Sequence, residues 1–148
     1  MYRNLLIATD GSELAHKAVT HGLCLAKSLN AAVTFVTATA NWSATEMSAR
    51  AERRAAHPIE DYEKAQAEWA ANVLSRTEEA ARKMGVSFTT VHARDTHAAD
   101  GIIQIAKSKG SDLIVMSSHG RRGVQRLLLG SVATEVLAHS TIPVLIIR

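Results

Sequence analysis

The sequence has little of several residue types that mark other classes of protein. Among its 148 residues there is one cysteine, Cys24, so no disulfide can form within the chain, and we expect a reducing compartment. Cys24 falls within a helical apolar pattern, which predicts a small core residue rather than a reactive thiol. No apolar run approaches the length of a membrane span, and the run within residues 1–12 is too short for a signal peptide. We therefore predict a cytoplasmic protein with no membrane partner.

Aromatic residues and charge of one sign are also scarce. The chain has two phenylalanines, two tryptophans and a formal net charge of +3 at pH 7. Proteins that bind nucleic acids usually concentrate basic residues on one face beside aromatic side chains, so we predict no nucleic-acid partner. The length is that of one domain, and an apolar content of 47% is enough for a core that needs neither disulfides nor metal. We predict a single domain over residues 1–148.

The common catalytic and nucleotide-binding motifs are missing. A P-loop requires Gly-Lys before Ser or Thr, and the chain contains no Gly-Lys. Gly120, Gly123 and Gly130 do not match Gly-x-Gly-x-x-Gly, and no Gly-x-Ser-x-Gly nucleophile elbow is present. The seven histidines are scattered, without the i, i+3 or i, i+4 pairing of a helical metal site. We therefore assign no catalytic residue and no metal ligand set.

What the chain does contain is a regular alternation of strand and helix patterns. Short apolar or β-branched segments predict five strands, at residues 5–8, 31–40, 86–93, 113–116 and 144–147. Helical periodicity predicts four helices between them, at residues 13–29 after an N-cap at Ser12, 59–84, 98–109 and 131–139. The order β-α-β-α-β-α-β-α-β predicts an α/β fold, a doubly wound, five-stranded parallel sheet with helices on both faces.

One segment does not fit the alternation. Residues 41–58 are polar, and we expect them to be irregular. Their arginine-rich patch, Arg50, Arg53 and Arg54, is typical of a solvated surface, and it assigns no function to the segment.

The fold predicts where a ligand would bind. In open parallel sheets, ligands bind at the carboxyl ends of the strands, near the point where strand order reverses. Polar residues follow the first predicted strand at 9–12 and the fourth at 117–120. Because these two strands are commonly adjacent in doubly wound sheets, we predict that their loops form one crevice.

The loop after the fourth predicted strand, "SSHGRRGVQRLLLGS" at residues 117–131, has the properties of an anion site. Glycine lets backbone N–H groups approach an anion without a Cβ in the way, and Gly130-Ser131 opens a helix whose positive dipole end faces the crevice. Ser131 either caps that helix or donates its hydroxyl to a phosphate. Arg121 and Arg122 either add positive charge to the site or are solvated.

The chain resembles a universal stress protein over nearly its whole length. The matching stretches are "NLLIATDGSELAHKAV", "GSDLIVMSSHGRRGVQRLLLGSVATEVL" and "IPVLIIR". The nucleotide-binding branch of that family carries Gly, two residues, Gly, nine residues, then Gly with Ser or Thr. Gly120 and Gly130-Ser131 match this pattern in register, whereas Ser117 stands at the position of the first glycine.

The resemblance implies a Rossmann-like fold of the adenine nucleotide α-hydrolase type and an adenine-nucleotide pocket for ATP or AMP, with Mg²⁺ entering through the nucleotide. Asp10 would reach ribose hydroxyls or act through the cation; as an alternative it forms a turn before Gly11. Ala38 would face the adenine edge, and Met116 would pack near the base or belong to the core. The full set of implied binding residues is Ala8, Thr9, Asp10, Ala38, Met116, Ser117, Ser118, Gly120, Gly130, Ser131 and Val132.

Three kinds of function agree with these features. The first is a regulatory module of the stress response that binds an adenine nucleotide; the second is a slow ATPase or nucleotidyl-transferring enzyme on the same scaffold. The third is an assembly module whose pocket no longer binds nucleotide because of Ser117. The apolar C-terminal strand predicts an exposed sheet edge, which favours a homodimer through residues 142–148, with Pro143 and Arg148 limiting further growth. Family resemblance implies the same dimer.

Overall fold

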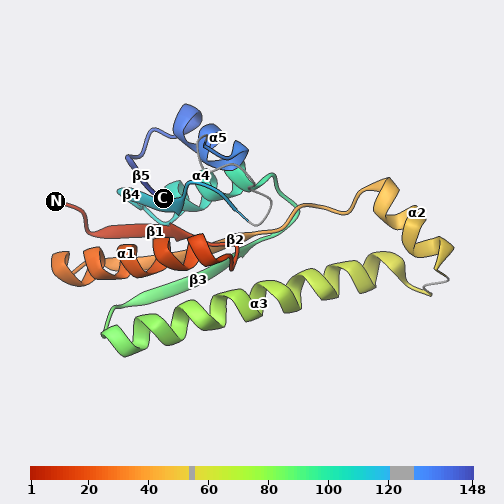
Figure 1. Ribbon diagram of the computed structural model, residues 1–148, viewed down its shortest axis with the longest axis horizontal. Helices are drawn as coiled ribbons and strands as arrows, with labels where there is room; N and C mark the ends of the chain where they lie inside the picture. Colours follow the sequence, from red (N-terminus) through yellow and green to blue (C-terminus); the bar gives the residue numbers. More distant parts are fainter. Residues whose placement is uncertain (54–55, 121–128) are drawn as a thin grey trace.

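The protein folds as a parallel sheet between two layers of helices (Figure 1). This computed structural model describes residues 1–53, 56–120 and 129–148. The strands are β1 (Asn4–Ala8), β2 (Ala32–Ala38), β3 (Phe88–Ala93), β4 (Leu113–Ser117) and β5 (Val144–Ile147). The helices are α1 (Glu13–Leu29), α2 (Ala44–Glu52), α3 (Pro58–Met84), α4 (Ala98–Ser108) and α5 (Ser131–His139).

The sheet has the order β3-β2-β1-β4-β5, and every neighbouring pair is parallel. The chain moves outward from β1 to β2 and β3, then crosses to β4 on the other side of β1. Strand order therefore reverses between β1 and β4, as predicted, and β5 lies at the edge of the sheet. The five-stranded parallel α/β fold predicted from the sequence is confirmed, although the predicted strands were longer than those observed for β2 and β3.

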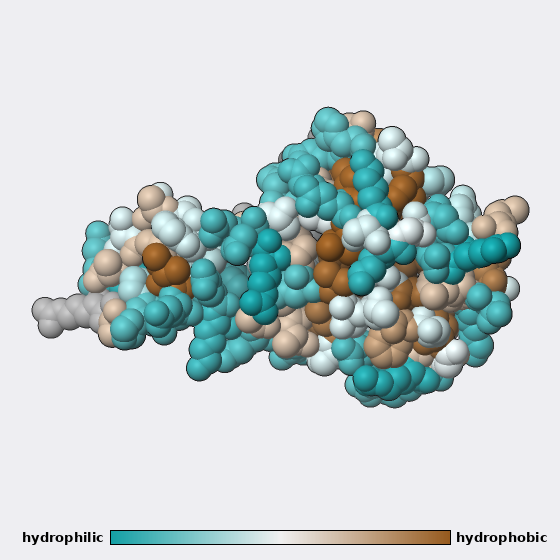
Figure 2. All heavy atoms as spheres, turned by 180° about the vertical axis from the view of Figure 1, so that it is seen from behind, coloured by the Kyte–Doolittle hydropathy of each residue, from teal (hydrophilic) through white to brown (hydrophobic). Residues whose placement is uncertain are grey.

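Alternating residues of the central strands fill two separate cores. Leu5 and Ile7 of β1 pack with α1 and α3 on one face, whereas Leu6 and Ala8 pack with α4 and α5 on the other. Figure 1 shows these two helix layers on opposite sides of the sheet, with α2 and the start of α3 lying away from it. The space-filling view shows hydrophobic side chains reaching the surface chiefly over the main body of the molecule (Figure 2). Both faces of β1 and β4 are buried, which explains their nearly continuous apolar sequences.

The start of α1 is as predicted, but Cys24 is not in the core. The Ala15 N–H donates to Ser12 Oγ at 3.2 Å, so Ser12 is the N-cap. Cys24 is exposed, and Leu29 keeps 36% of its surface exposed. The prediction that Cys24 is a core residue is wrong because the buried stripe of this helix consists of Ala15, Ala18, Val19, Gly22, Leu23 and Ala26.

The segment predicted to be irregular contains a helix. A capping box starts α2: the Glu46 N–H donates to Ser43 Oγ at 3.2 Å, and the Ser43 N–H donates to Glu46 Oε2 at 3.1 Å. The helix buries none of its residues, so no apolar stripe indicated it in the sequence. Arg50 lies over the ring of Tyr62 at 5.3 Å, which brings α2 against α3, while Arg54 is outside the described residues.

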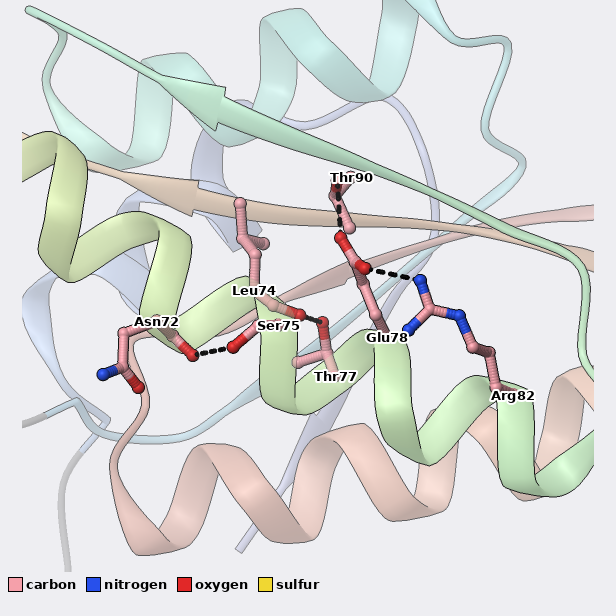
Figure 3. A network of polar contacts seen from close by, with 7 residues as sticks. All are labelled: Asn72, Leu74, Ser75, Thr77, Glu78, Arg82 and Thr90. Atoms are coloured by element: carbon pink, nitrogen blue, oxygen red, sulfur yellow. Dashed lines mark hydrogen bonds and ion pairs between the residues drawn. The ribbon is translucent and has the colours of Figure 1, made fainter.

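Polar contacts hold α3 against β3 (Figure 3). Glu78 accepts from Thr90 Oγ1 at 3.4 Å and from the Arg82 guanidinium at 2.8 Å. Arg82 also lies 5.4 Å from the centre of the Phe88 ring. These contacts fix the position of α3 along the sheet and, with it, the side chains that α3 places near β1.

Candidate functional site

The two predicted ligand-binding loops lie side by side at the carboxyl edge of the sheet. Leu5, Leu6 and Ile7 of β1 pair with Leu113, Ile114 and Val115 of β4. Both strands end within two residues of this pairing, so the segments that follow them leave the sheet together. The prediction that the loops after the first and fourth strands are neighbours is confirmed.

The turn between β1 and α1 is held by its own polar side chains. Thr9 is buried, and its Oγ1 accepts from the Gly11 N–H at 3.2 Å. Asp10 Oδ1 accepts from the Ser12 N–H at 3.0 Å, and Gly11 has a φ of +75°, a conformation that favours glycine. Asp10 therefore has the turn-forming role that was one of its two predicted alternatives, and its second oxygen faces the segment after β4.

The segment after β4 is fixed by hydroxyl groups and by the backbone. Ser117 Oγ donates to the His119 carbonyl at 2.8 Å, and Ser118 Oγ lies 3.1 Å from His119 Nδ1. The Ser118 N–H donates to the Ile147 carbonyl at 2.8 Å, and the Gly130 N–H donates to the Ser118 carbonyl at 2.8 Å. These contacts join the ends of β4 and β5 to the start of α5.

Two glycines of this segment stand where a side chain would press closely on the protein itself. A Cβ on Gly120 would lie 2.6 Å from Asp10 Oδ2. A Cβ on Gly130 would lie 3.1 Å from the Ser118 carbonyl oxygen and 3.4 Å from His119 Cα. Glycine at both positions is thus explained by close packing around the crevice, whether or not a ligand is bound.

The helix that follows the crevice starts at Gly130. Gly130 is the N-cap of α5, with a φ of −65°, and no side chain caps this end of the helix among the described residues. The first of the two predicted roles of Ser131 is therefore wrong: Ser131 is the first residue of the helix and is exposed. An uncapped helix N-terminus has free N–H groups and the positive end of the helix dipole.

The apolar residues of the predicted site share one face of the sheet. Ala8 and Met116 are buried in the core beneath α4 and α5, and Ala38 and Val132 pack against it while partly exposed. Met116 thus has the core position that was one of its two predicted alternatives. These four apolar residues surround the ends of β1, β2 and β4, together with Thr9, Asp10 and residues 117–120 and 130–131. Arg121, Arg122 and Gly123 lie outside the described residues.

A cavity of about 460 Å³ lies on the opposite face, between the β1–α1 turn and α3. It shares Thr9 and Asp10 with the predicted site and includes Glu68, Trp69 and Asn72 of α3. Sequence reasoning missed it because α3 is far from β1 along the chain. The sequence signal for it was the spacing of Glu68 and Asn72, two polar residues four positions apart on either side of Trp69.

His92 is the histidine with a shifted pKa at the carboxyl edge. Burial is the main cause that lowers the pKa of His92; the neighbouring Arg94 lowers it further, and Asp95 opposes both. His92 Nε2 lies 2.7 Å from Thr39 Oγ1, and Arg94 Nε donates to Nδ1 at 3.3 Å. Because Nδ1 accepts a hydrogen bond, this arrangement suits the neutral ring.

Neither a metal-binding cluster nor a membrane-spanning helix is present within residues 1–53, 56–120 and 129–148. No group of three or more His, Cys, Asp or Glu residues there is arranged to hold a metal ion. No helix in this described part is long and apolar enough to span a membrane.

Comparisons with known proteins give consistent results. The model of the universal stress protein family matches residues 1–148. The chain is 32% identical to universal stress protein YxiE of Bacillus subtilis over 149 residues, which cover all of both proteins. It is 29% identical to universal stress protein MJ0531 of Methanocaldococcus jannaschii, over all of this chain and 83% of that protein.

Solved structures share the fold. Universal stress protein UspA from Lactobacillus plantarum matches with a TM-score of 0.84 and 21% identity, over 99% of this chain and 98% of that one. A universal stress protein solved in complex with cAMP has a TM-score of 0.69 at 22% identity, over 99% and 97% of the two chains. Another, from Archaeoglobus fulgidus and in complex with dAMP, has a TM-score of 0.61 at 18% identity, over 99% and 98%.

Proposed function

We propose that this chain, which belongs to the universal stress protein family, binds an adenine nucleotide, ATP or AMP, in the crevice between the β1–α1 turn and the β4–α5 segment. The observation that carries the proposal is the convergence of three features at one edge of the sheet: the Asp10 carboxylate, Gly120 beside it, and the start of α5 at Gly130, which no side chain caps among the described residues. Free N–H groups at a helix N-terminus favour phosphate. Complexes of related folds with cAMP and dAMP support an adenine nucleotide.

The contacts already present in the loop assign different parts to its residues. The hydroxyls of Ser117 and Ser118 are engaged with His119, so these serines shape the loop rather than bind phosphate through their side chains. The N–H groups of Ser131 and Val132, at the start of α5, bind the phosphates. Ala38 packs beside the base, Thr9 lies at the rim and Asp10 accepts from ribose hydroxyls, while Ala8 and Met116 belong to the core beneath them.

Binding, rather than rapid turnover, is the proposed activity. Mg²⁺ would enter with the nucleotide, because Mg²⁺ is commonly held by one or two carboxylates and substrate phosphates, and Asp10 supplies a carboxylate at the crevice. The sequence has no P-loop lysine, and no general base is assigned. The chain would therefore act as a regulatory module of the stress response, with turnover far below the ~10 s⁻¹ typical of enzymes.

The proposed assembly is a homodimer through residues 142–148. The edge position of β5 and the exposure of Leu145, at 36%, support it, because an unpaired apolar edge favours pairing with a second copy.

Substitution of Ser131 by aspartate tests the crevice without disturbing the fold. Ser131 is exposed, and a carboxylate in the first turn of a helix usually stabilises that helix by about 0.3–1 kcal/mol. The same carboxylate would repel the phosphates. We expect Ser131→Asp to bind ATP at least tenfold more weakly in calorimetric titration, and AMP more weakly too, with no loss of thermal stability.

The matched control is Ser87→Asp, which adds the same charge at an exposed position between α3 and β3. Ser87 lies at the amino end of β3, whereas the crevice lies at the carboxyl ends of the strands. The Ser87→Asp variant should bind like the parent. Mass spectrometry of gently purified protein provides a second readout, since a co-purifying nucleotide excludes an assembly module without ligand. If Ser131→Asp binds ATP as tightly as the parent, the crevice is not the phosphate site.

A further inference from the structure

We propose that α2 and the start of α3 form an arm that binds the same arm of a second copy of this chain, with the basic end of α2 against the acidic start of α3 in both directions. The arm consists of residues 42–53 and 56–64, and it stands away from the sheet (Figure 1). Figure 2 shows it as a lobe beside the main body, with hydrophobic side chains at its surface. Helix α3 packs on β2 and β3, whereas β5 is the strand at the opposite edge, so this surface differs from the proposed β5 contact.

Helix α2 lacks the packing that a short helix needs. It has nine residues and buries none of them. Isolated helices shorter than about 12–15 residues are only marginally stable in water, and most helices are stabilised by packing against other elements. The capping box at Ser43 stabilises one end of α2, and Arg50 over the Tyr62 ring holds one side. A partner that covers α2 would supply packing that its own chain does not.

The inner side of the arm is fixed to the rest of the chain. Tyr62 is buried, with 7% of its surface exposed, and its hydroxyl donates to the Ala40 carbonyl at 3.4 Å. Arg50 lies 5.3 Å from the centre of the same ring. The arm therefore presents its outer side in a defined orientation, which lowers the conformational entropy lost when a partner binds.

The distribution of charge identifies the partner as a second copy. Residues 50–54 contain three arginines and one glutamate, whereas residues 58–64 contain two glutamates, one aspartate and one lysine. A two-fold contact uses the same patch on both copies, so it requires both charges on one surface, and the arm has both. Among the residues that the structure describes, the side chains of Arg53 and Glu63 form no ion pair or hydrogen bond with other groups.

One face of α2 has room for an acidic side chain from the partner. A hollow of about 360 Å³ has Glu46, Ala49, Arg50 and Arg53 in its described lining. The carboxylate of Glu46 is engaged with Ser43 at the start of the helix, at 3.0 Å from its Oγ. The two guanidinium groups remain at the other end of the hollow, and arginine binds carboxylates through charge-assisted hydrogen bonds.

The side chains around the charged groups suit contact with a protein. Trp42 is 37% exposed and Ile59 is 38% exposed. Aromatic residues and arginine are enriched in interfaces between proteins. A nucleic acid or an anionic membrane would meet the arginines but also the acidic start of α3 beside them, so a second copy is the better fit.

Charge reversal tests the contact by sedimentation velocity. Every variant also carries Leu145→Lys, so that the proposed β5 contact is disfavoured. We expect a dimer that dissociates at least tenfold more readily when salt is raised from about 0.1 M to about 1 M, because the Debye length falls from about 10 Å to about 3 Å. Arg53→Glu and Glu63→Arg should each weaken it at least tenfold, because like charges then meet twice. An equimolar mixture of these two variants should recover the dimer, since both contacts then join opposite charges.

The control is Arg76→Glu, which makes the same charge reversal at an exposed position of α3 outside the arm. It should leave the association unchanged. Arg53 and Glu63 are also exposed, so all variants should fold, which thermal melts verify.

Three results would overturn the proposal. They are the absence of a dimer at about 0.1 M salt, failure of the mixture to recover the dimer, and an equal effect of Arg76→Glu and Arg53→Glu. Because high salt screens the arm, the β5 contact of the parent is measured alone there. Its absence would count against β5 and not against the arm, and failure to bind ATP would count only against the crevice.

Discussion

Asp10 Oδ2 occupies the space that a side chain at position 120 would need: it lies 2.6 Å from where a Cβ on Gly120 would be. Asp10 belongs to the turn after β1 and Gly120 to the segment after β4, so this contact joins the two halves of the crevice. The carboxylate cannot simply rotate away, because Oδ1 accepts a hydrogen bond from the Ser12 N–H. Asp10 is therefore the reason that position 120 requires a glycine.

Gly120→Ala should destabilise the protein through this contact. Overpacking of a fitted position typically costs about 1–3 kcal/mol, and we expect a value near the lower limit because Gly120 is exposed. The measurement is a double-mutant cycle by denaturant unfolding, with Asp10→Ala as the second change. Removing the carboxylate should remove most of the cost of the alanine, which gives a coupling energy of at least about 0.5 kcal/mol. Additive effects of the two substitutions would contradict the contact.

Ser117 and Ser111 give a matched pair of buried serines at the two ends of β4. The Ser117 hydroxyl donates to the His119 carbonyl, whereas the buried Ser111 hydroxyl has no hydrogen-bond partner among the described residues. Ser117→Ala should lower the free energy of unfolding by about 1 kcal/mol, because a hydrogen bond is lost. Ser111→Ala should cost nothing or stabilise the protein, because an unpaired buried polar group is removed. Equal effects in urea unfolding would show that the Ser117 bond does not hold the loop.

The sequence was sufficient to predict the sheet and the neighbouring positions of the loops after β1 and β4. Central strands such as β1 and β4 are buried on both faces, so their unbroken apolar runs identify them, and alternation with helices determines the parallel order. Helix α2 was missed because it buries nothing, and only the spacing of Ser43 and Glu46 indicates its start. Periodicity detects burial, so it cannot detect a helix that is polar on every side.

The sequence does not show why a glycine is needed at position 130. Gly130 matches a phosphate-binding pattern, yet the structure shows that a Cβ there would press on the backbone of Ser118 and His119. A larger residue at this position would disturb folding as well as binding, so it cannot distinguish the two. Ser131, exposed and one residue later, can. The cavity near Trp69 was beyond sequence reasoning because it depends on how α3 lies against the β1–α1 turn.

His92 should make the stability of the protein depend on pH. Burial and Arg94 lower the pKa of His92 in the folded state, so the unfolded chain binds a proton there more readily. The stability contributed by the neutral ring is present above the ordinary histidine pKa of about 6.5 and is lost as the pH falls through the lower folded pKa. We expect thermal melts of the parent to decline more steeply on acidification below pH ~6.5 than those of His92→Gln, which does not titrate. Parallel profiles would contradict this role of His92.

Leu145 should control the proposed association of two copies through β5. Its side chain is 36% exposed on the edge strand, where an unpaired apolar edge favours pairing with a second chain. Leu145→Lys would place a charge in that contact, so we expect the dimer to dissociate at least tenfold more readily. Leu29→Lys is the control, because Leu29 has the same exposed fraction at the end of α1 and does not belong to the edge strand. Sedimentation velocity at micromolar concentration measures both. A parent protein that sediments only as a monomer would contradict the dimer, and equal effects of the two substitutions would place any dimer contact elsewhere than β5.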